Sequence, residues 1–203
     1  QYFKDLEALD AINQKYGTNI SYSDYKEREQ KRKGGTEIFA QDKVEANRLG
    51  VDLNEYRGLK DYPGGPEKGI HYKKDAQWYG LTLDQYNKFA DKAGSNFEQA
   101  KNDFAQLKRL GFNNYNVALD YARSTDLTIP EFADLFRQID VENRNQVLSQ
   151  KEVKDFLNAH PEISDEEAQK IWAIGGFKSE DGTQDTLLYR GKNNKWTSGY
   201  PKK

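Results

Sequence analysis

The segment from Asp140 to Glu152 carries the side chains best suited to chemistry in this chain. Asp140, Glu142 and Glu152 supply carboxylates, and Asn143 and Asn145 supply amides between them. Such oxygens are the ligands that Ca²⁺ and Mg²⁺ prefer in proteins. The spacing of apolar residues predicts one helix over 128–138 and another over 149–158, so this segment connects two helices. It is the best candidate for a metal site in the sequence.

The segment resembles the calcium-binding loop of the EF-hand family, with oxygen ligands at positions 1, 3 and 5, glycine at 6 and glutamate at 12. Counted from Asp140, Glu142 fits position 3, but Arg144 stands at position 5 and Lys151 at position 12. Glu152 comes one residue too late and is also expected to cap the following helix. We therefore predict a connector with no metal, and keep a calcium-responsive binding module as an alternative.

Paired carboxylates suit glycoside hydrolysis, which needs two acidic groups about 5 to 9 Å apart, one with a raised pKa. The candidate pairs are Glu131 with Asp134 and Glu166 with Glu167. Capping of helices accounts for Glu131 and Glu167 without any catalytic role. The sequence has no nucleophile elbow, phosphate-binding loop or H-E-x-x-H motif. We predict no catalytic residue, no cofactor and no enzymatic activity.

The remaining candidate residues have structural interpretations. His71 is expected in a Gly/Pro-rich loop and His160 at a helix end, and the absence of cysteine excludes disulfides and Cys-based zinc sites. Four aromatic residues could stack on a sugar or a base, but their spacing favours packing in the core: Trp78, Tyr79, Tyr86 and Phe89.

A short pattern that recurs five times predicts where helices begin. Each copy has an apolar residue, then Ser, Thr or Asp, then Glu or Gln three positions later. This is a capping box beside a hydrophobic staple, in which the side chains at both ends of the box bond to backbone amides. The five cap residues are Asp52, Thr82, Thr128, Ser149 and Ser164.

The composition indicates an ordered, polar, helical protein. Of 203 residues, 35% are hydrophobic and 32% charged, while 13 Tyr, 10 Phe and 3 Trp supply packing surface. The net charge of -2 argues against a sequence-independent nucleic-acid binder, and the mixed charges of 26–33 suit a solvated helix face. No stretch is apolar enough to cross a membrane. A chain that begins at Gln1 and lacks Met is expected to be an excerpt or a processed product.

The order of apolar, Gly and Pro residues predicts an all-α fold of short antiparallel helices. An N-terminal helical segment covers 1–57, a Gly/Pro-rich loop or linker 58–76, and a helical domain 77–177. Residues 178–203 form an extended tail or a small β-hairpin. Glycines that recur at intervals near 30 residues favour helical pairs, without a regular solenoid.

Residues 79–174 resemble a module of large structural proteins of tailed bacteriophages, including tape-measure-like proteins. The resemblance rests on the helix start Gly80-Leu81-Thr82-Leu83-Asp84-Gln85-Tyr86, the EF-hand-like connector, Ile171-Trp172 and the Asn-rich tail near Trp196. It implies a structural or interaction role in the virion, without a cofactor.

We therefore expect a fragment of a phage virion protein that docks on other virion proteins or on copies of itself. Its location would be the phage particle, and the host cytoplasm during assembly. The expected docking residues are Tyr189, Trp196 and Tyr200, with the loop 58–76. The alternative from another class is a cell-wall-degrading enzyme carried in a virion or secreted.

Overall fold

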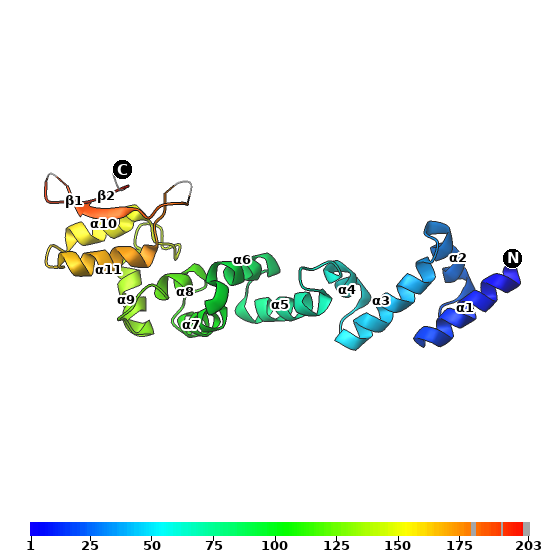
Figure 1. Ribbon diagram of the computed structural model, residues 1–203. Helices are drawn as coiled ribbons and strands as arrows, with labels where there is room; N and C mark the ends of the chain where they lie inside the picture. Colours follow the sequence, from blue (N-terminus) through cyan, green and yellow to red (C-terminus); the bar gives the residue numbers. More distant parts are fainter. Residues whose placement is uncertain (180–181, 192, 201–203) are drawn as a thin grey trace. The chain divides into compact units, whose positions relative to one another are not determined.

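The structure, a computed structural model, describes residues 1–179, 182–191 and 193–200 and is mainly helical, with a small antiparallel hairpin (Figure 1). The helices are α1 (Tyr2–Tyr16), α2 (Tyr22–Lys31), α3 (Gly35–Leu49), α4 (Leu53–Leu59), α5 (Pro66–Tyr79), α6 (Leu83–Ala93), η1 (Gly94–Asn96), α7 (Phe97–Arg109), α8 (Asn116–Tyr121), α9 (Ile129–Ile139), α10 (Gln150–Ala159) and α11 (Asp165–Gly175). The strands are β1 (Leu187–Arg190) and β2 (Trp196–Gly199). The prediction of an all-α fold with a C-terminal hairpin is confirmed. Part of the predicted tail 178–203 lies outside the described residues.

A long helix followed by a shorter one recurs along the first part of the chain. The long helices α1, α3, α5 and α7 begin at residues 2, 35, 66 and 97. Gly50 and Gly80, which follow α3 and α5, have φ angles of 67° and 69°. Glycine adopts this left-handed conformation without steric cost, so it ends a helix cleanly. The glycine spacing in the sequence therefore marks the ends of long helices.

All five predicted helix starts are present. Thr82, Thr128, Ser149 and Ser164 form complete capping boxes at the starts of α6, α9, α10 and α11. Asp52 caps α4 by accepting from the amides of Asn54 and Glu55 at 2.8 and 3.0 Å. The Glu55 carboxylate does not close that box, because it pairs with Lys73 Nζ at 2.7 Å.

The prediction of an irregular connection over 58–76 is wrong, because α5 begins at Pro66. Proline suits the first turn of a helix, where its missing N–H removes no helical hydrogen bond. Gly69 lies inside this helix, and a Cβ there would stand 2.8 Å from Cγ of Tyr62. The glycine therefore lets the Tyr62 ring pack against the helix backbone.

Contacts divide the chain into two compact units, Gln1–Trp78 and a second that begins at Tyr79. One buried cluster of the first unit joins α1, α2 and α3. It contains Leu9, Ile20, Tyr25 and Ala40, with Ile12, Tyr16, Tyr22 and Phe39 partly buried around them. Further buried residues lie on α4 and α5: Tyr56, Leu59 and Ile70. The buried Asp42 carboxylate adds ion pairs to Arg57 and Lys60 at 2.9 and 2.6 Å.

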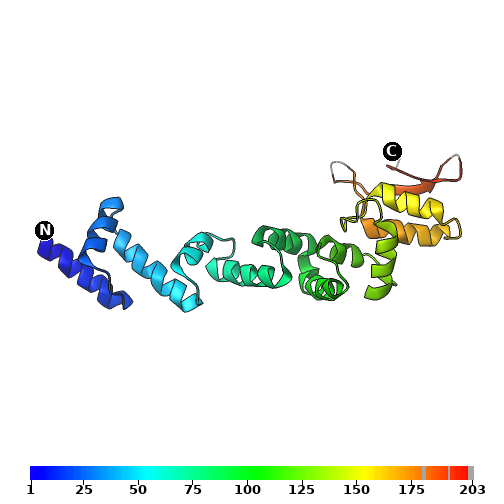
Figure 2. The same ribbon diagram turned by 180° about the vertical axis from the view of Figure 1, so that it is seen from behind.

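The second unit has a larger core built on aromatic rings. The Tyr79 and Phe104 rings stack with their centroids 5.8 Å apart, and Phe89 meets Phe104 edge-on at 5.8 Å. Phe132 and Phe136 of α9 continue this core. Both views show the hairpin beside α10 (Figures 1 and 2), and hydrogen bonds from Gln169 and Trp172 join it to α11. None of the described helices is long and apolar enough to cross a membrane.

Candidate functional site

The hairpin has one face packed against the helices. Leu188 and Trp196 lie on that face, and their exposed fractions are 5% and 4%. The prediction that Trp196 is an exposed docking anchor is therefore wrong. The Arg190 guanidinium lies over the Trp196 ring, 3.9 Å from its centroid, which covers the ring further.

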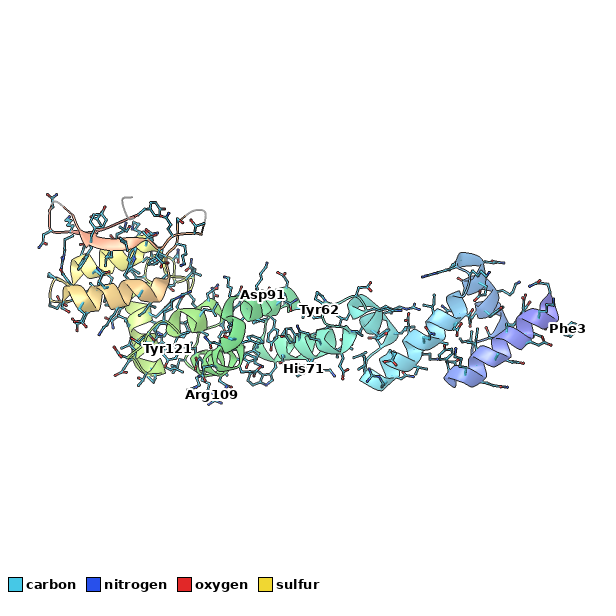
Figure 3. The ribbon with its side chains drawn as sticks, in the orientation of Figure 1. Phe3, Tyr62, His71, Asp91, Arg109 and Tyr121 are labelled. Atoms are coloured by element: carbon cyan, nitrogen blue, oxygen red, sulfur yellow. The ribbon has the colours of Figure 1, made fainter. Side chains whose placement is uncertain are left out.

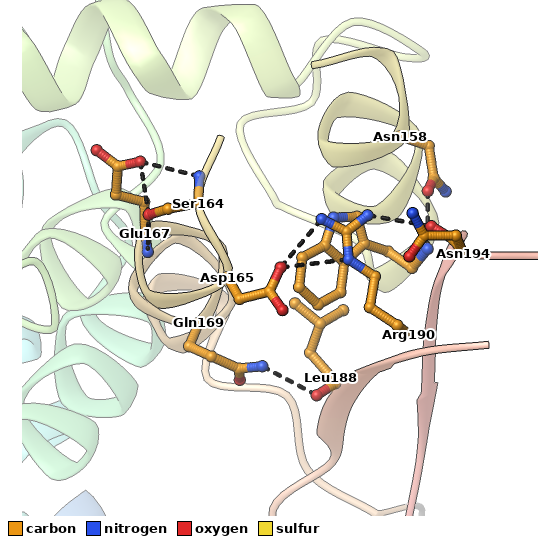
Figure 4. A network of polar contacts seen from close by, with 9 residues as sticks. Asn158, Ser164, Asp165, Glu167, Gln169, Leu188, Arg190 and Asn194 are labelled. Atoms are coloured by element: carbon orange, nitrogen blue, oxygen red, sulfur yellow. Dashed lines mark hydrogen bonds and ion pairs between the residues drawn. The ribbon is translucent and has the colours of Figure 1, made fainter. Parts of the chain in front are cut away.

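Polar contacts fix both strands to the helices (Figure 4). On β2, the Trp196 backbone N–H donates to Asn158 Oδ1 at 2.8 Å. On β1, the Leu188 carbonyl accepts from Gln169 Nε2 at 3.0 Å, and Arg190 Nη2 pairs with Asp165 Oδ1 at 3.0 Å. Backbone groups that a further strand would use are thus bonded to helix side chains. This arrangement disfavours recognition by strand addition at these positions.

Further contacts hold the hairpin near its open end. The Trp172 indole N–H donates to the Thr186 carbonyl at 2.7 Å. The Ser198 hydroxyl donates to Gln150 Oε1 at 3.0 Å and accepts from Lys154 Nζ at 3.1 Å. The hairpin is therefore a docked part of the second unit. The alternative of an extended arm is not observed in the described residues of the tail.

The opposite face of the hairpin presents large side chains to solvent. Leu187 and Tyr189 alternate with the buried Leu188 and are 49% and 48% exposed, and Tyr200, which follows β2, is 52% exposed. The Tyr189 ring lies over Gly199, where an added Cβ would stand 3.2 Å from Tyr189 Oη. We call Leu187 and Tyr189 of this face, together with the exposed Tyr200 beyond the end of β2, the outer hairpin surface. Exposed aromatic and aliphatic groups on a fixed support are typical of protein-binding surfaces.

The predicted aromatic cluster divides between core and solvent. Tyr79, Tyr86 and Phe89 are buried, as the sequence predicts. Trp78, the neighbouring residue at the end of α5, is 70% exposed. The four side chains therefore do not form a common stacking surface.

The connector between α9 and α10 is a compact loop around Asp140. Asp140 Oδ2 accepts from the Gln146 backbone N–H at 2.8 Å. Arg144 and Gln146 have positive φ angles of 49° and 60°, which turn the backbone back toward Asp140. As predicted, Glu152 completes the capping box of α10. Within the described residues, no group of three or more His, Cys, Asp or Glu side chains is placed to hold a metal.

The carboxylates singled out for hydrolysis are held in helix caps. Thr128 donates to Glu131 from both its hydroxyl and its backbone, and these bonds lower the pKa of Glu131 below its ordinary value. Ser164 lowers the pKa of Glu167 in the same way. A general acid needs a raised pKa, so neither environment suits that role.

Two buried carboxylates that the sequence analysis missed line a cleft of about 840 Å³ in the second unit. Burial raises the pKa of Asp103, and it raises the pKa of Asp120 to about 7 against the opposing charge of Arg123. Asp120 Oδ1 accepts from Arg123 Nη1 at 2.8 Å, and the same nitrogen donates to the Ile174 carbonyl at 3.2 Å. Asp120 thus positions Arg123 against the end of α11. The sequence did contain one sign that Asp120 is buried, because it is the acidic residue within the otherwise apolar stretch 117–121.

One histidine lies within a helix and the other directly follows a helix. His71 lies on α5 (Figure 3) and not in a loop, with Nε2 3.7 Å from Asp75 Oδ2. His160 follows α10, as the sequence predicts, and its Nδ1 lies 2.9 Å from Glu162 Oε1.

Comparison of the chain with protein-family models, with curated proteins and with solved structures finds no match.

Proposed function

We propose that the protein is a structural component of a bacteriophage particle, tape-measure-like in kind, that docks on other virion proteins through the outer hairpin surface. The observation that carries the docking role is the contrast between the two faces of the hairpin. Leu188 and Trp196 are buried, while Leu187 and Tyr189 on the opposite face are about half exposed. The phage assignment rests on the resemblance of residues 79–174.

A fixed hairpin suits a binding surface for an energetic reason. Association costs free energy wherever flexible segments become ordered, so a surface that is ordered beforehand binds more tightly. Contacts from Asn158, Gln169 and Asp165 already order both strands. Tyrosine adds a large contact area with few rotatable bonds and a hydroxyl that can hydrogen-bond.

Loss of docking is the first test. The double substitution Leu187→Ser, Tyr189→Ser removes exposed apolar surface and leaves the buried face intact. In phage carrying it, we expect the protein to be lost from purified particles, as measured by mass spectrometry. Trp78→Ser, which alters an exposed aromatic residue of the first unit, is the matched control and should leave incorporation unchanged. Normal incorporation of a folded double variant would refute the docking role.

Sedimentation of the purified chain would reveal binding to copies of itself.

A cell-wall-degrading enzyme is the second candidate, because Asp103 and Asp120 line a cleft and have raised pKa values. A carboxyl group that stays protonated near neutral pH can act as a general acid. Clearing of purified peptidoglycan by the protein, and its loss in Asp120→Asn, would establish this activity. Absence of clearing between pH 5 and 8 would remove it.

A further inference from the structure

We propose that the cleft of about 840 Å³ in the second unit binds a primary ammonium group carried on a flexible aliphatic chain, with the Asp103 carboxylate as its anionic partner. The lining of the cleft and the outer hairpin surface have no described residue in common. Binding of an amine also needs no hydrolysis. Such a site is therefore independent of both functions proposed above.

Asp103 is a buried carboxylate without a positively charged partner. Its exposed fraction is 5%, and it lies on α7 in the lining of the cleft. Asp103 Oδ1 accepts from the neutral Gln99 Nε2 at 2.8 Å, and within the described residues no other hydrogen bond or ion pair reaches this carboxylate. Burial raises the pKa of Asp103, and the bond from Gln99 offsets this rise only in part. An ionised carboxylate in such a place is costly unless a positive charge meets it.

The cations that line the cleft have other partners. Lys92 Nζ donates to an amide side chain of α8 at 3.1 Å, and Arg123 Nη1 pairs with Asp120 Oδ1 at 2.8 Å. Lys178 pairs with an aspartate near the hairpin. None of these three groups forms an ion pair with Asp103 in the part of the chain that the structure describes. A cation from solution can therefore take this place.

Neutral oxygens lie on the same helix face as Asp103. Asn96 at the end of η1 and Gln99 and Asp103 of α7 are three and four residues apart, so they share one face, and all three line the cleft. The side-chain oxygens of Asn96 and Gln99 accept no hydrogen bond from any described residue. Two amide oxygens and one carboxylate oxygen match the three N–H donors of a primary ammonium.

The same geometry favours an ammonium over a guanidinium. A guanidinium binds a carboxylate best as a planar fork that uses both oxygens. Gln99 already occupies Asp103 Oδ1, so a single carboxylate oxygen remains. A compact ammonium needs only that one.

Apolar side chains complete the lining and suit an aliphatic chain. Ala100 lies on the same face of α7, and Leu119, Val147 and Leu148 line the cleft as well. Val147 is 41% exposed, so part of this apolar surface is open to solvent. Methylene groups that cover it would be removed from water, which favours binding.

Isothermal titration calorimetry of the full chain with n-pentylamine at about pH 8 tests the site. The amine is protonated there, because the ordinary pKa of a primary alkylammonium such as that of lysine is about 10.4. We expect saturable binding of one molecule per chain. Asp103→Asn should weaken it by about tenfold or more, because hydrogen bonds between charged groups are the strong ones. Asparagine keeps an acceptor for Gln99, and the melting temperature of the variant verifies that it folds.

Two matched controls isolate the charge. Asp134→Asn makes the same change at an exposed aspartate of α9 outside the cleft and should bind the amine like the wild type. The alcohol 1-pentanol has the same chain without the charge and should bind about tenfold more weakly or less. Nα-acetyl-lysinamide carries the ammonium on a peptide unit: tighter binding of this compound would assign the site to a lysine of a partner protein, and tighter binding of pentylamine to a free amine.

Nuclear magnetic resonance locates the bound amine. Changes in backbone amide shifts should centre on residues that line the cleft, Ala100 and Leu119 among them. Absence of pentylamine binding to the wild type would overturn the proposal and leave Asp103 neutralised by its own proton. Equal affinity of the wild type and a folded Asp103→Asn would also overturn it. Peptidoglycan clearing enters neither measurement, so failure of the enzymatic candidate leaves the amine site standing.

Discussion

Carboxyl groups of this protein differ in chemistry because their surroundings differ. Glu131 and Glu167 accept hydrogen bonds at exposed helix starts, and these bonds favour the ionised form. Asp120 is buried beside Arg123, and loss of hydration outweighs the attraction of that guanidinium. Acidic residues that look alike in the sequence therefore have different roles: Glu131 and Glu167 cap helices, and Asp120 is a buried group that titrates.

Asp120 should make stability depend on pH near neutrality. Its pKa of about 7 in the folded state exceeds the ordinary value of 3.8. Its stabilising contribution is therefore complete below about pH 4 and is lost as pH rises through 7. As pH rises from 6 to 8, we expect the contribution of Asp120 to the free energy of unfolding to fall by about 1 kcal/mol. The charges of Arg123 and Lys92 lower the pKa of Asp120, but burial outweighs both.

Chemical denaturation of the wild type and of Asp120→Asn at pH 6, 7 and 8 measures this contribution. The asparagine keeps an acceptor for Arg123 but cannot titrate, so the variant should show the smaller dependence on pH. Parallel curves for the two proteins would contradict the assignment. The pH dependence common to both proteins would then come from other groups, Asp103 among them, whose pKa is also raised by burial.

At the scale of elements, the hairpin depends on contacts made far along the chain. The Trp196 amide meets Asn158, 38 residues earlier, and Trp172 meets Thr186. An isolated two-stranded hairpin is marginally stable in water. The helices α10 and α11 therefore supply the stability that lets a short hairpin present the outer hairpin surface.

Substitution of the two hairpin aromatics should separate the buried face from the exposed face. Trp196→Ala removes a buried indole and should lower the free energy of unfolding by about 3 to 5 kcal/mol. Tyr189→Ala alters an exposed ring and should change it by about 0.5 kcal/mol or less. Urea titration followed by circular dichroism compares the two variants with the wild type. Equal losses would mean that both rings have the same structural role.

The helix starts could be predicted because they depend on residues close together in the sequence. Contacts between residues far apart in the sequence could not be predicted. The five caps depend on residues three positions apart, which a sequence displays directly. The Gly/Pro-rich composition of 58–76 predicts a loop, because the sequence does not show that Gly69 makes room for the Tyr62 ring inside a helix. Trp196 was expected to be exposed because nothing local indicates that Asn158 and Arg190 enclose it. The carboxylate at position 140 was recognised, but its unsatisfied oxygen becomes evident only in three dimensions.

The whole molecule consists of two compact units with unequal cores. The first unit has exposed aromatic residues near the N-terminus, where Phe3 points away from its helix (Figure 3). The second unit has the aromatic core and the docked hairpin. The proposed assembly role therefore rests on the second unit, whose outer hairpin surface would bind the partner.

Photo-crosslinking within phage particles tests the central claim, that the outer hairpin surface binds another virion protein. Tyr189 is replaced by p-benzoylphenylalanine, the particles are irradiated, and cross-linked peptides are identified by mass spectrometry. Position 78, an exposed tryptophan of the first unit, carries the same label as a control. We expect position 189 to give a specific cross-link to one other virion protein. Cross-links from position 78 with none from position 189 in assembled particles would contradict this assignment.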